Sequence, residues 1–200
     1  MVKYVLFSLF AVLWGLTVAS QNLVPNPQFE LTTPTTAEYA YYNPRMECYT
    51  EPCNTNLFRL SPAKNWTIWL GTTQPYACVL TELVKAGSNC VPLWPNYVMG
   101  NMMHVKTTVG GSGIVNSDIP AGKNRVRVTS WVYVVKGAVV MSYGPTGIGL
   151  VSARSLSLCK WEKLEVVYDG SKGPANQVTL YADNKGDAEF YSDAVSVVVY

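Results

Sequence analysis

Residues 125–135 read RVRVTSWVYVV, and this stretch decides the fold class. Small or aliphatic residues occupy every second position, with charged, hydroxyl and aromatic residues between them; the first set is Val126, Val128, Ser130, Val132 and Val134. Because successive side chains of a β-strand point to opposite faces, this period of two predicts a strand with one buried face. The many β-branched and aromatic residues favour the same interpretation.

The same alternation recurs on both sides of this stretch. It is clear in residues 162–168 (EKLEVVY), 177–182 (QVTLYA) and 190–200 (FYSDAVSVVVY), and weaker in residues 66–70, 78–84, 98–107, 113–119 and 138–143. Turns containing Gly or Pro separate the runs, and only residues 80–85 also fit a short helix. Roughly eight to eleven short strands joined by turns are typical of a two-sheet antiparallel β-sandwich, whose common extracellular form is the jelly roll. We therefore predict an all-β sandwich.

Composition supports a folded domain and excludes several functions. With 48% hydrophobic and 12% aromatic residues the chain is not disordered, and 200 residues make one large domain or two small ones. A net charge of +2 is too small for a surface that neutralises phosphates, so we expect no nucleic-acid partner. A single histidine, His104, weakens any mechanism that needs a histidine base or several histidine metal ligands.

Residues 1–20 have the features of a secretory signal peptide. Lys3 supplies a positive charge, residues 4–19 are almost all apolar, and small residues stand at Ala19 and Ser20. A membrane anchor is the alternative, but this run is shorter than the about 20 residues that a span needs, and no later stretch is long enough. We expect a secreted, extracellular protein, free or held in a cell wall or matrix. Its single domain spans residues 21–200, with no membrane span after signal cleavage.

Cysteine usage agrees with an oxidising compartment. The simplest pairing joins Cys48 to Cys53 in CYTEPC and Cys78 to Cys90, and leaves Cys159 free, buried or bonded to another chain. Other connectivities remain possible because sequence alone does not fix them. A zinc site is the rival explanation, but the chain has no C-x-x-C pair and no histidine cluster.

Residues 32–95 differ from the rest of the chain. They are rich in Pro, Tyr, Asn and Cys, and we predict a loop-rich insertion near residues 37–95 that decorates one edge or face of the sandwich. This region holds the sequon Asn65-Trp66-Thr67, which predicts glycosylation of Asn65 in a secreted eukaryotic protein. A short sequon also arises by chance.

The two ends of the mature chain resemble a known family. Residues 22–30 (NLVPNPQFE) and 189–197 (EFYSDAVSV) are similar to the first and last segments of carbohydrate-binding modules with the galactose-binding-like jelly-roll fold, as in families 4, 9 and 22. The order of the middle segments agrees: GNMMHV (100–105), SGIVNSDIPAG (112–122) and CKWEKLEVVY (159–168). Two departures are Pro27, where the family usually has Gly, and Ala194, where it often has a second acid.

The resemblance implies a structural Ca²⁺ ion held by Glu30 and Asp193. The first and last strands of such a sandwich lie side by side, so these acids can converge although 163 positions separate them. Two carboxylates with backbone carbonyls suit an ion that takes six to eight oxygen ligands. The alternative is that both acids are ordinary polar residues at strand ends.

The resemblance also implies a sugar-binding surface. Sugars offer apolar C–H faces and polar edges, which flat aromatic rings and amides complement. The candidates are Trp94, Tyr97, Trp69, Tyr41, Tyr42 and Asn116. Trp94 lies between two prolines in PLWPNY, which stiffen its backbone. We assign Trp66, Trp131 and Trp161 to the structure, since they lie in or beside strands with apolar neighbours.

Catalysis has little support in the sequence. We expect His104, in the apolar context MMHVK, to be a half-buried histidine with its hydrogen bonds satisfied. We therefore predict a secreted, non-catalytic, lectin-like or wall-associated protein whose partner is a polysaccharide or glycoprotein glycan. The alternatives are a structural protein of a cell wall, spore coat or extracellular matrix, a small polysaccharide lyase or hydrolase, and a module that recognises protein.

Overall fold

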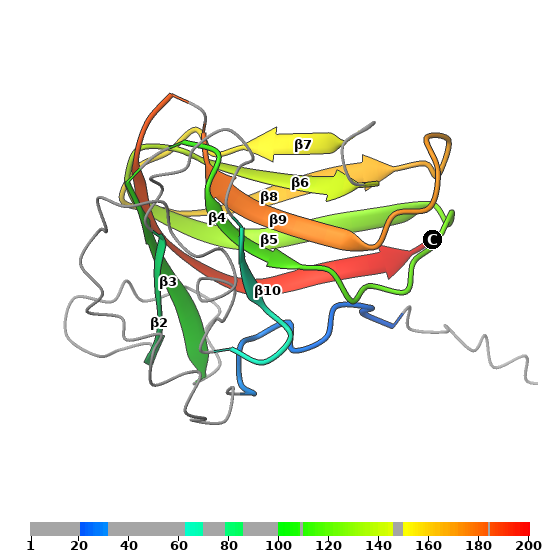
Figure 1. The fold of residues 1–200 in the computed structure, drawn as a ribbon, viewed down its shortest axis with the longest axis horizontal. Helices are drawn as coiled ribbons and strands as arrows, with labels where there is room; N and C mark the ends of the chain where they lie inside the picture. Colours follow the sequence, from blue (N-terminus) through cyan, green and yellow to red (C-terminus); the bar gives the residue numbers. More distant parts are fainter. Residues whose placement is uncertain are drawn as a thin grey trace, which may run out of the picture.

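A computed structural model describes residues 21–31, 63–69, 79–85, 100–108, 110–145, 150–183 and 185–200. In these ranges the chain forms ten strands in two antiparallel five-stranded sheets (Figure 1). The first sheet has the order β1 (Thr67–Trp69), β4 (Gly113–Asn116), β9 (Gln177–Ala182), β6 (Val139–Gly144) and β7 (Val151–Arg154). The second has the order β2 (Val79–Lys85), β3 (Asn101–Thr107), β10 (Ala188–Val199), β5 (Val126–Lys136) and β8 (Trp161–Tyr168). The predicted two-sheet β-sandwich is confirmed.

Most predicted strands exist within one or two residues of their expected bounds. The helical alternative for residues 80–85 is wrong, because this segment pairs with β3 as strand β2. Strand β7 was not predicted: its four residues, VSAR, contain only Val151 and Ala153 as apolar residues, and so short a run does not establish a period of two. Within the described residues, no helix has the length and apolar character to cross a membrane.

The predicted insertion contributes to both sheets. Its described residues are 63–69 and 79–85, and they include β1 and β2. Each of these strands lies at the edge of a sheet, β1 beside β4 and β2 beside β3. The predicted signal peptide lies outside the described residues.

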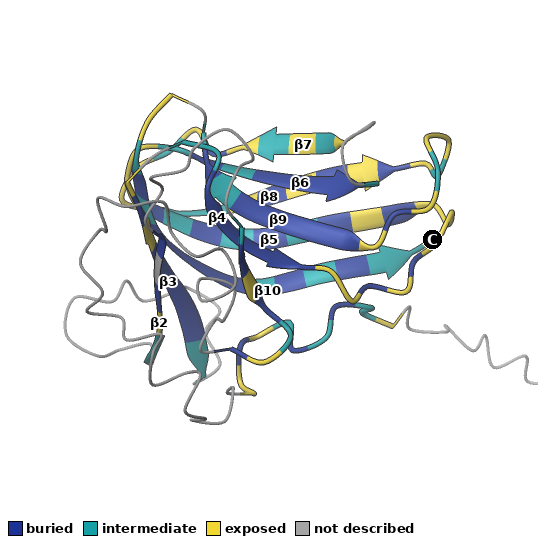
Figure 2. Cartoon of the chain, in the orientation of Figure 1, coloured by how far each residue is buried: buried dark blue, intermediate teal, exposed yellow. Residues whose placement is uncertain are grey.

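The core lies between the two sheets. Residues 125–135 show this most clearly, because every second residue of this stretch faces the core. The residues of β5 that the sequence places on one face are all buried, with exposed fractions of 0–1%. They face buried residues of the other sheet such as Ile114, Met141 and Leu180. Figure 2 shows the alternation of buried and less buried positions along the strands. Burial of this apolar surface is the main contribution to the stability of the sandwich.

Strand β10 lies in the middle of the second sheet, between β3 and β5. Its register with β5 shifts between Asp193 and Ser196, and Ala194 there has a φ of 49°. Such a β-bulge inserts one extra residue and reverses which positions face the core. Phe190 is therefore buried in the core before the bulge, and Val197 is buried there after it.

The N-terminal segment runs along β10 at this bulge (Figure 1). The amide of Leu23 donates to the carbonyl of Val197 at 2.8 Å, and the amide of Val195 donates to the carbonyl of Pro27 at 2.9 Å. The side chain of Asn22 donates to the carbonyl of Val195 at 3.0 Å. The two ends of the domain thus lie side by side, as the family resemblance implied.

Asn26 fixes the turn that follows this contact. Its φ of 50° is left-handed, a conformation that Asn tolerates better than most residues. Its side-chain amide donates to the carbonyls of Leu31 and Lys64 at 2.8 and 2.9 Å, and its oxygen accepts from the amide of Leu31 at 2.8 Å. The indole of Trp66, only 2% exposed, donates to the backbone carbonyl of Asn26 at 3.0 Å. These bonds join the N-terminal segment to the chain just before β1.

Replacing Asn26 should destabilise the fold. Asn26→Ala removes three side-chain hydrogen bonds from a buried site, and we expect a loss of about 2–4 kcal/mol in the free energy of unfolding. Asn26→Gly keeps the left-handed backbone accessible, so its cost isolates the lost hydrogen bonds. Urea denaturation of both variants, with exposed Asn176→Ala as the control, measures these effects. An Asn26→Ala variant as stable as the control would contradict this role.

Candidate functional site

The outer face of the second sheet carries polar and aromatic side chains. In β5 the inner positions are buried, whereas Thr129, Trp131 and Tyr133 on the opposite face are half-buried. The alternation in β8 places Trp161 on the same outer side as its partner Tyr133. This face is the part of the described structure where aromatic rings gather outside the core.

Four rings form a row across four neighbouring strands, which we call the aromatic row. His104 of β3 stacks on Tyr191 of β10, with ring centroids 4.4 Å apart and planes 11° apart. Tyr191 meets Tyr133 of β5 edge-on at 6.3 Å, and Tyr133 meets Trp161 of β8 edge-on at 5.7 Å. Each neighbouring pair is also a directly opposed pair in the sheet register. The register therefore creates the row from residues that are distant in sequence.

The row is closed at one end and open at the other. His104 and Tyr191 are 6% and 8% exposed, whereas Tyr133 and Trp161 are half-buried. Trp131, two residues before Tyr133 on the same strand, is half-buried as well. The accessible ring surface thus lies over β5 and β8, with the His104 end packed against its neighbours.

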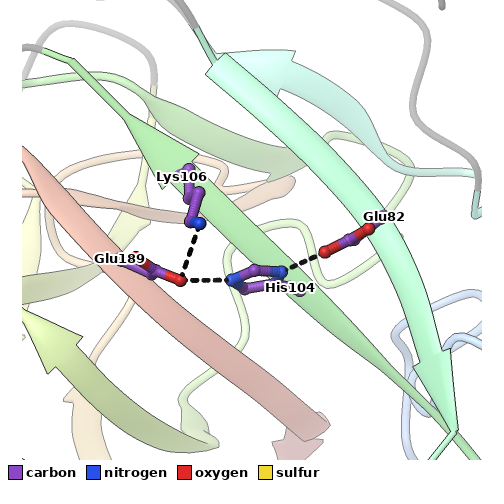
Figure 3. A network of polar contacts seen from close by, with 4 residues as sticks. All are labelled: Glu82, His104, Lys106 and Glu189. Carbon is purple, nitrogen blue, oxygen red and sulfur yellow. Dashed lines mark hydrogen bonds and ion pairs between the residues drawn. The ribbon is translucent and has the colours of Figure 1, made fainter. Parts of the chain in front are cut away.

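A network of charged groups surrounds the closed end (Figure 3). Nδ1 of His104 contacts Oε1 of Glu82 in β2, and its Nε2 lies 3.0 Å from Oε1 of Glu189 in β10. The ammonium of Lys106 lies 3.1 Å from the same Glu189 oxygen. Burial alone would raise the pKa of Glu189, but the hydrogen bonds and charges of Lys106 and His104 together hold it below its usual value. His104 has a hydrogen-bond partner at each ring nitrogen, as predicted, but it is buried and not half-buried.

Glu30 and Asp193 converge, as the resemblance implied. Asp193 is 6% exposed, and burial, together with the nearby charge of Glu30, raises its pKa to about 7 although the amide of Ala194 donates to it. Glu30 accepts a hydrogen bond at 2.7 Å from the amide of Asn101. Its carboxylate lies so close to Gly100 that a Cβ added there would meet it at 2.0 Å. A larger residue at position 100 would therefore have to displace the Glu30 carboxylate from its present position beside the Asn101 amide.

The two acids alone do not complete a metal site. Among the described residues, no group of three or more His, Cys, Asp or Glu side chains is placed to hold an ion. Two converging carboxylates, one of them buried, nevertheless suit a hard cation whose remaining ligands are backbone carbonyls. The donor chemistry therefore fits calcium better than zinc, which prefers Cys and His.

The predicted sugar-binding residues do not form one described surface. Trp94, Tyr97, Tyr41 and Tyr42 lie outside the described residues, and Trp69 is half-buried in β1 of the first sheet. Asn116 is fully buried: its amide donates to the carbonyl of Pro25 at 3.0 Å and its oxygen accepts from the amide of Asp118. The expectation that Asn116 faces a sugar is wrong, because its buried side chain bonds the N-terminal segment at Pro25 and the backbone just after β4 instead.

Several other predicted positions can be placed. Cys48, Cys53, Cys78 and Cys90 lie outside the described residues; within them Cys159 is exposed and free of any disulfide. Asn65 lies half-buried in the turn before β1, with a φ of 68°. Trp66 belongs to the core as predicted, whereas Trp131 and Trp161 lie half-buried on the outer face.

The comparisons with known proteins identify a shared fold. No family model and no curated protein matches the sequence. Among solved structures, the CBM22-1–GH10 modules of xylanase 10B from Clostridium thermocellum, complexed with xylohexaose, align with a TM-score of 0.51 and 12% identity over 90% of this chain. The chain has the jelly-roll fold of carbohydrate-binding modules. It spans 29% of that xylanase chain.

Two further carbohydrate-binding modules are similar at lower scores. A family 61 module in complex with β-1,4-galactotriose aligns at 15% identity and a TM-score of 0.46, covering 90% of this chain and 100% of that one. A family 11 module from Clostridium thermocellum, in complex with a β-1,3-1,4-mixed-linked tetrasaccharide, aligns at 17% identity and a TM-score of 0.43, covering 70% of this chain and 92% of that one.

Asp193 should make stability depend on pH in calcium-free buffer. Because its pKa is raised in the folded state, the folded protein holds this proton up to about pH 7, and the free energy of unfolding should fall as the pH rises from about 4 to above 7. Asp193→Asn should remove this fall and stabilise the protein at pH 8 by roughly 1–3 kcal/mol, with little effect at pH 4. Urea denaturation in EDTA at both pH values tests this, with exposed Asp118→Asn as the control. Equal effects of the two variants at pH 8 would contradict it.

Proposed function

We propose that this protein is a secreted, non-catalytic glycan-binding protein, and that the accessible part of the aromatic row is its binding surface. The observation that carries the proposal is the row itself, in which the rings of Tyr133 and Trp161 meet edge-on and lie half-buried on the outer face of the second sheet. The jelly-roll fold supports the same assignment. Secretion rests on the signal-peptide pattern of residues 1–20.

The rings of Tyr133 and Trp161 are held in place before a sugar binds, which favours binding. Tyr and Trp rings offer broad apolar surface to the C–H face of a sugar, together with a polar group at one edge. Tyr133 and Trp161 are placed by strand register and by contact with each other, so little side-chain freedom is lost on binding. Hydroxyl groups of the same sugar can donate to carboxylates on this face and accept from Lys106. A neutral polysaccharide or glycoprotein glycan is therefore the partner that this surface fits.

Truncating either open ring should weaken glycan binding. Tyr133→Ala and Trp161→Ala each remove a stacking surface, and we expect at least tenfold weaker binding to whichever glycan the wild type retains. The measurement is retention of residues 21–200 on soluble and insoluble glycans, including xylan, β-galactan and mixed-linked β-glucan. Tyr181→Ala is the matched control, because Tyr181 is also a half-buried aromatic residue but lies in the other sheet and is not a sugar-binding candidate. Circular dichroism must show that each variant is folded.

The possible outcomes separate the competing assignments. Binding that survives in both ring variants but falls in Trp94→Ala would move the site to the predicted loop residues Trp94, Tyr97, Tyr41 and Tyr42. A folded protein that retains no glycan would overturn the proposal and favour a structural role in a wall, coat or matrix. Release of reducing ends that depends on one acid would favour a lyase or hydrolase.

We also propose a structural calcium ion at Glu30 and Asp193. An ion there would neutralise two carboxylates that now oppose each other, one of which is buried. Adding millimolar CaCl₂ at pH 8 should raise the melting temperature by several degrees, and the effect should vanish in Asp193→Asn and Glu30→Gln. Differential scanning calorimetry measures this, with MgCl₂ and Asp118→Asn as controls. An equal rise in Asp193→Asn would place the ion elsewhere.

A further inference from the structure

We infer that His104 is a positioning residue that makes ligand binding at the aromatic row depend on pH, an inference that rests on the proposed glycan-binding function. His104 holds Glu82 and Glu189 at the closed end of the row only while both of its ring nitrogens carry protons. Loss of one proton releases a carboxylate and changes the end of the surface against which a ligand binds.

The hydrogen-bond geometry requires the doubly protonated ring. Both nitrogens of His104 face a carboxylate oxygen, Nδ1 that of Glu82 and Nε2 that of Glu189 at 3.0 Å. Ionised carboxylates only accept hydrogen bonds, so each contact needs an N–H on the imidazole. A neutral imidazole has one N–H, and its other nitrogen would turn a lone pair toward a carboxylate oxygen. The neutral ring can therefore hold only one of the two acids.

The charges around His104 balance only when the ring is positive. Among the described residues, Glu82 faces it from β2, Glu189 and the ring of Tyr191 face it from β10, and Lys106 lies two residues along its own strand. With His104 charged, two cations meet two carboxylates. With His104 neutral, one negative charge is left without a cation, beside a side chain that is only 7% exposed. Water replaces a lost hydrogen-bond partner poorly at such a buried position.

Glu82 is the acid that the neutral ring would release. Glu189 has a second cation, since Lys106 lies 3.1 Å from its carboxylate. The side chain of Glu82 is 46% exposed, and that of Glu189 is 25% exposed. Glu82 thus has less support and easier access to water, so it leaves the network first.

The change reaches the ligand surface through Tyr191. The imidazole stacks on the Tyr191 ring at 4.4 Å, and Tyr191 contacts Tyr133, the first accessible ring of the row. A charged imidazole is attracted to the face of the tyrosine ring, and a neutral one is attracted less. Below the transition both carboxylates hold His104 at the closed end of the row, and two acceptors stand in fixed positions for sugar hydroxyls. Above it, one acceptor is lost and the row is less ordered.

The test is glycan affinity as a function of pH. For the glycan that the wild type retains, we expect binding to weaken about tenfold between pH 5 and pH 8.5, the effect of one charge-assisted hydrogen bond. His104→Gln has a single donor group at every pH, so its affinity should be low and independent of pH. Glu82→Gln should flatten the profile as well, because an amide can donate to a neutral imidazole. Lys163→Gln, an exposed change on the same face, should leave the profile unchanged.

A second measurement needs no ligand. His104 is the only histidine, so its two ring ¹⁵N signals are identified without ambiguity. We expect both nitrogens to be protonated at pH 5, and the signals of the Tyr191 ring to shift over the same pH interval in which one ring proton is lost. In Glu82→Gln the shift of the Tyr191 signals with the loss of the His104 ring proton should change, whereas Lys163→Gln should match the wild type.

The outcomes distinguish failure of this inference from failure of the proposed function. Glycan binding that is independent of pH between 5 and 8.5 would overturn the role of His104 and leave the binding surface in place. An unchanged pH profile in His104→Gln would do the same. Absence of glycan binding at every pH, from folded protein, would overturn the proposed function and this inference with it.

Discussion

Insertion of β10 between β3 and β5 is the interaction on which the rest of the structure depends. This strand completes the middle of the second sheet from the C-terminal end of the chain, and its bulge receives the N-terminal segment. Its inner residues, such as Phe190 and Val197, belong to the core, and its outer residues include Glu189, Tyr191 and Asp193. The same pairing thus closes the sandwich and assembles the candidate site. Because these contacts join residues far apart in sequence, they form only once most of the chain is in place.

The strands were predictable where one face is buried and the other is not. Residues 125–135 and 162–168 predicted β5 and β8 because burial of one face imposes a period of two. In residues 80–85, LTELVK, Leu80, Leu83 and Val84 have the spacing of a helical face, so local pattern alone did not decide between helix and strand. Pairing with β3 made it a strand, which shows tertiary context overriding local preference. In β10 the switch of buried positions from Phe190 to Val197 is visible in the sequence, but its cause, the bulge, is not.

The candidate site was predicted less well than the fold. The sequence predicted a sugar-binding surface made mainly of aromatic residues in the loop-rich region. The aromatic row instead consists of one ring from each of four strands. Nothing in the spacing of His104, Tyr133, Trp161 and Tyr191 along the chain indicates contact, because the row depends on strand order and register. Glu30 and Asp193 were found because the resemblance to a family supplied the missing information, namely that the chain ends lie side by side. The resemblance also suggested that Asn116 faces a sugar, and this was wrong, since its side-chain amide donates to the carbonyl of Pro25 in the N-terminal segment.

The bulge links the stability of the domain to the geometry of its outer face. Glu189, Tyr191 and Asp193 alternate along one side of β10, so the charged network, the aromatic row and the terminal acids share one backbone. Asp193 borders the bulge, and its carboxylate accepts from the amide of Ala194 inside it. A cation held by Asp193 and Glu30 would therefore fix the bulge together with the N-terminal segment that binds it. Fixing the bulge also fixes the register upstream, which places Tyr191 opposite both His104 and Tyr133. A structural ion at the chain ends would thus order the aromatic row, which it would not contact.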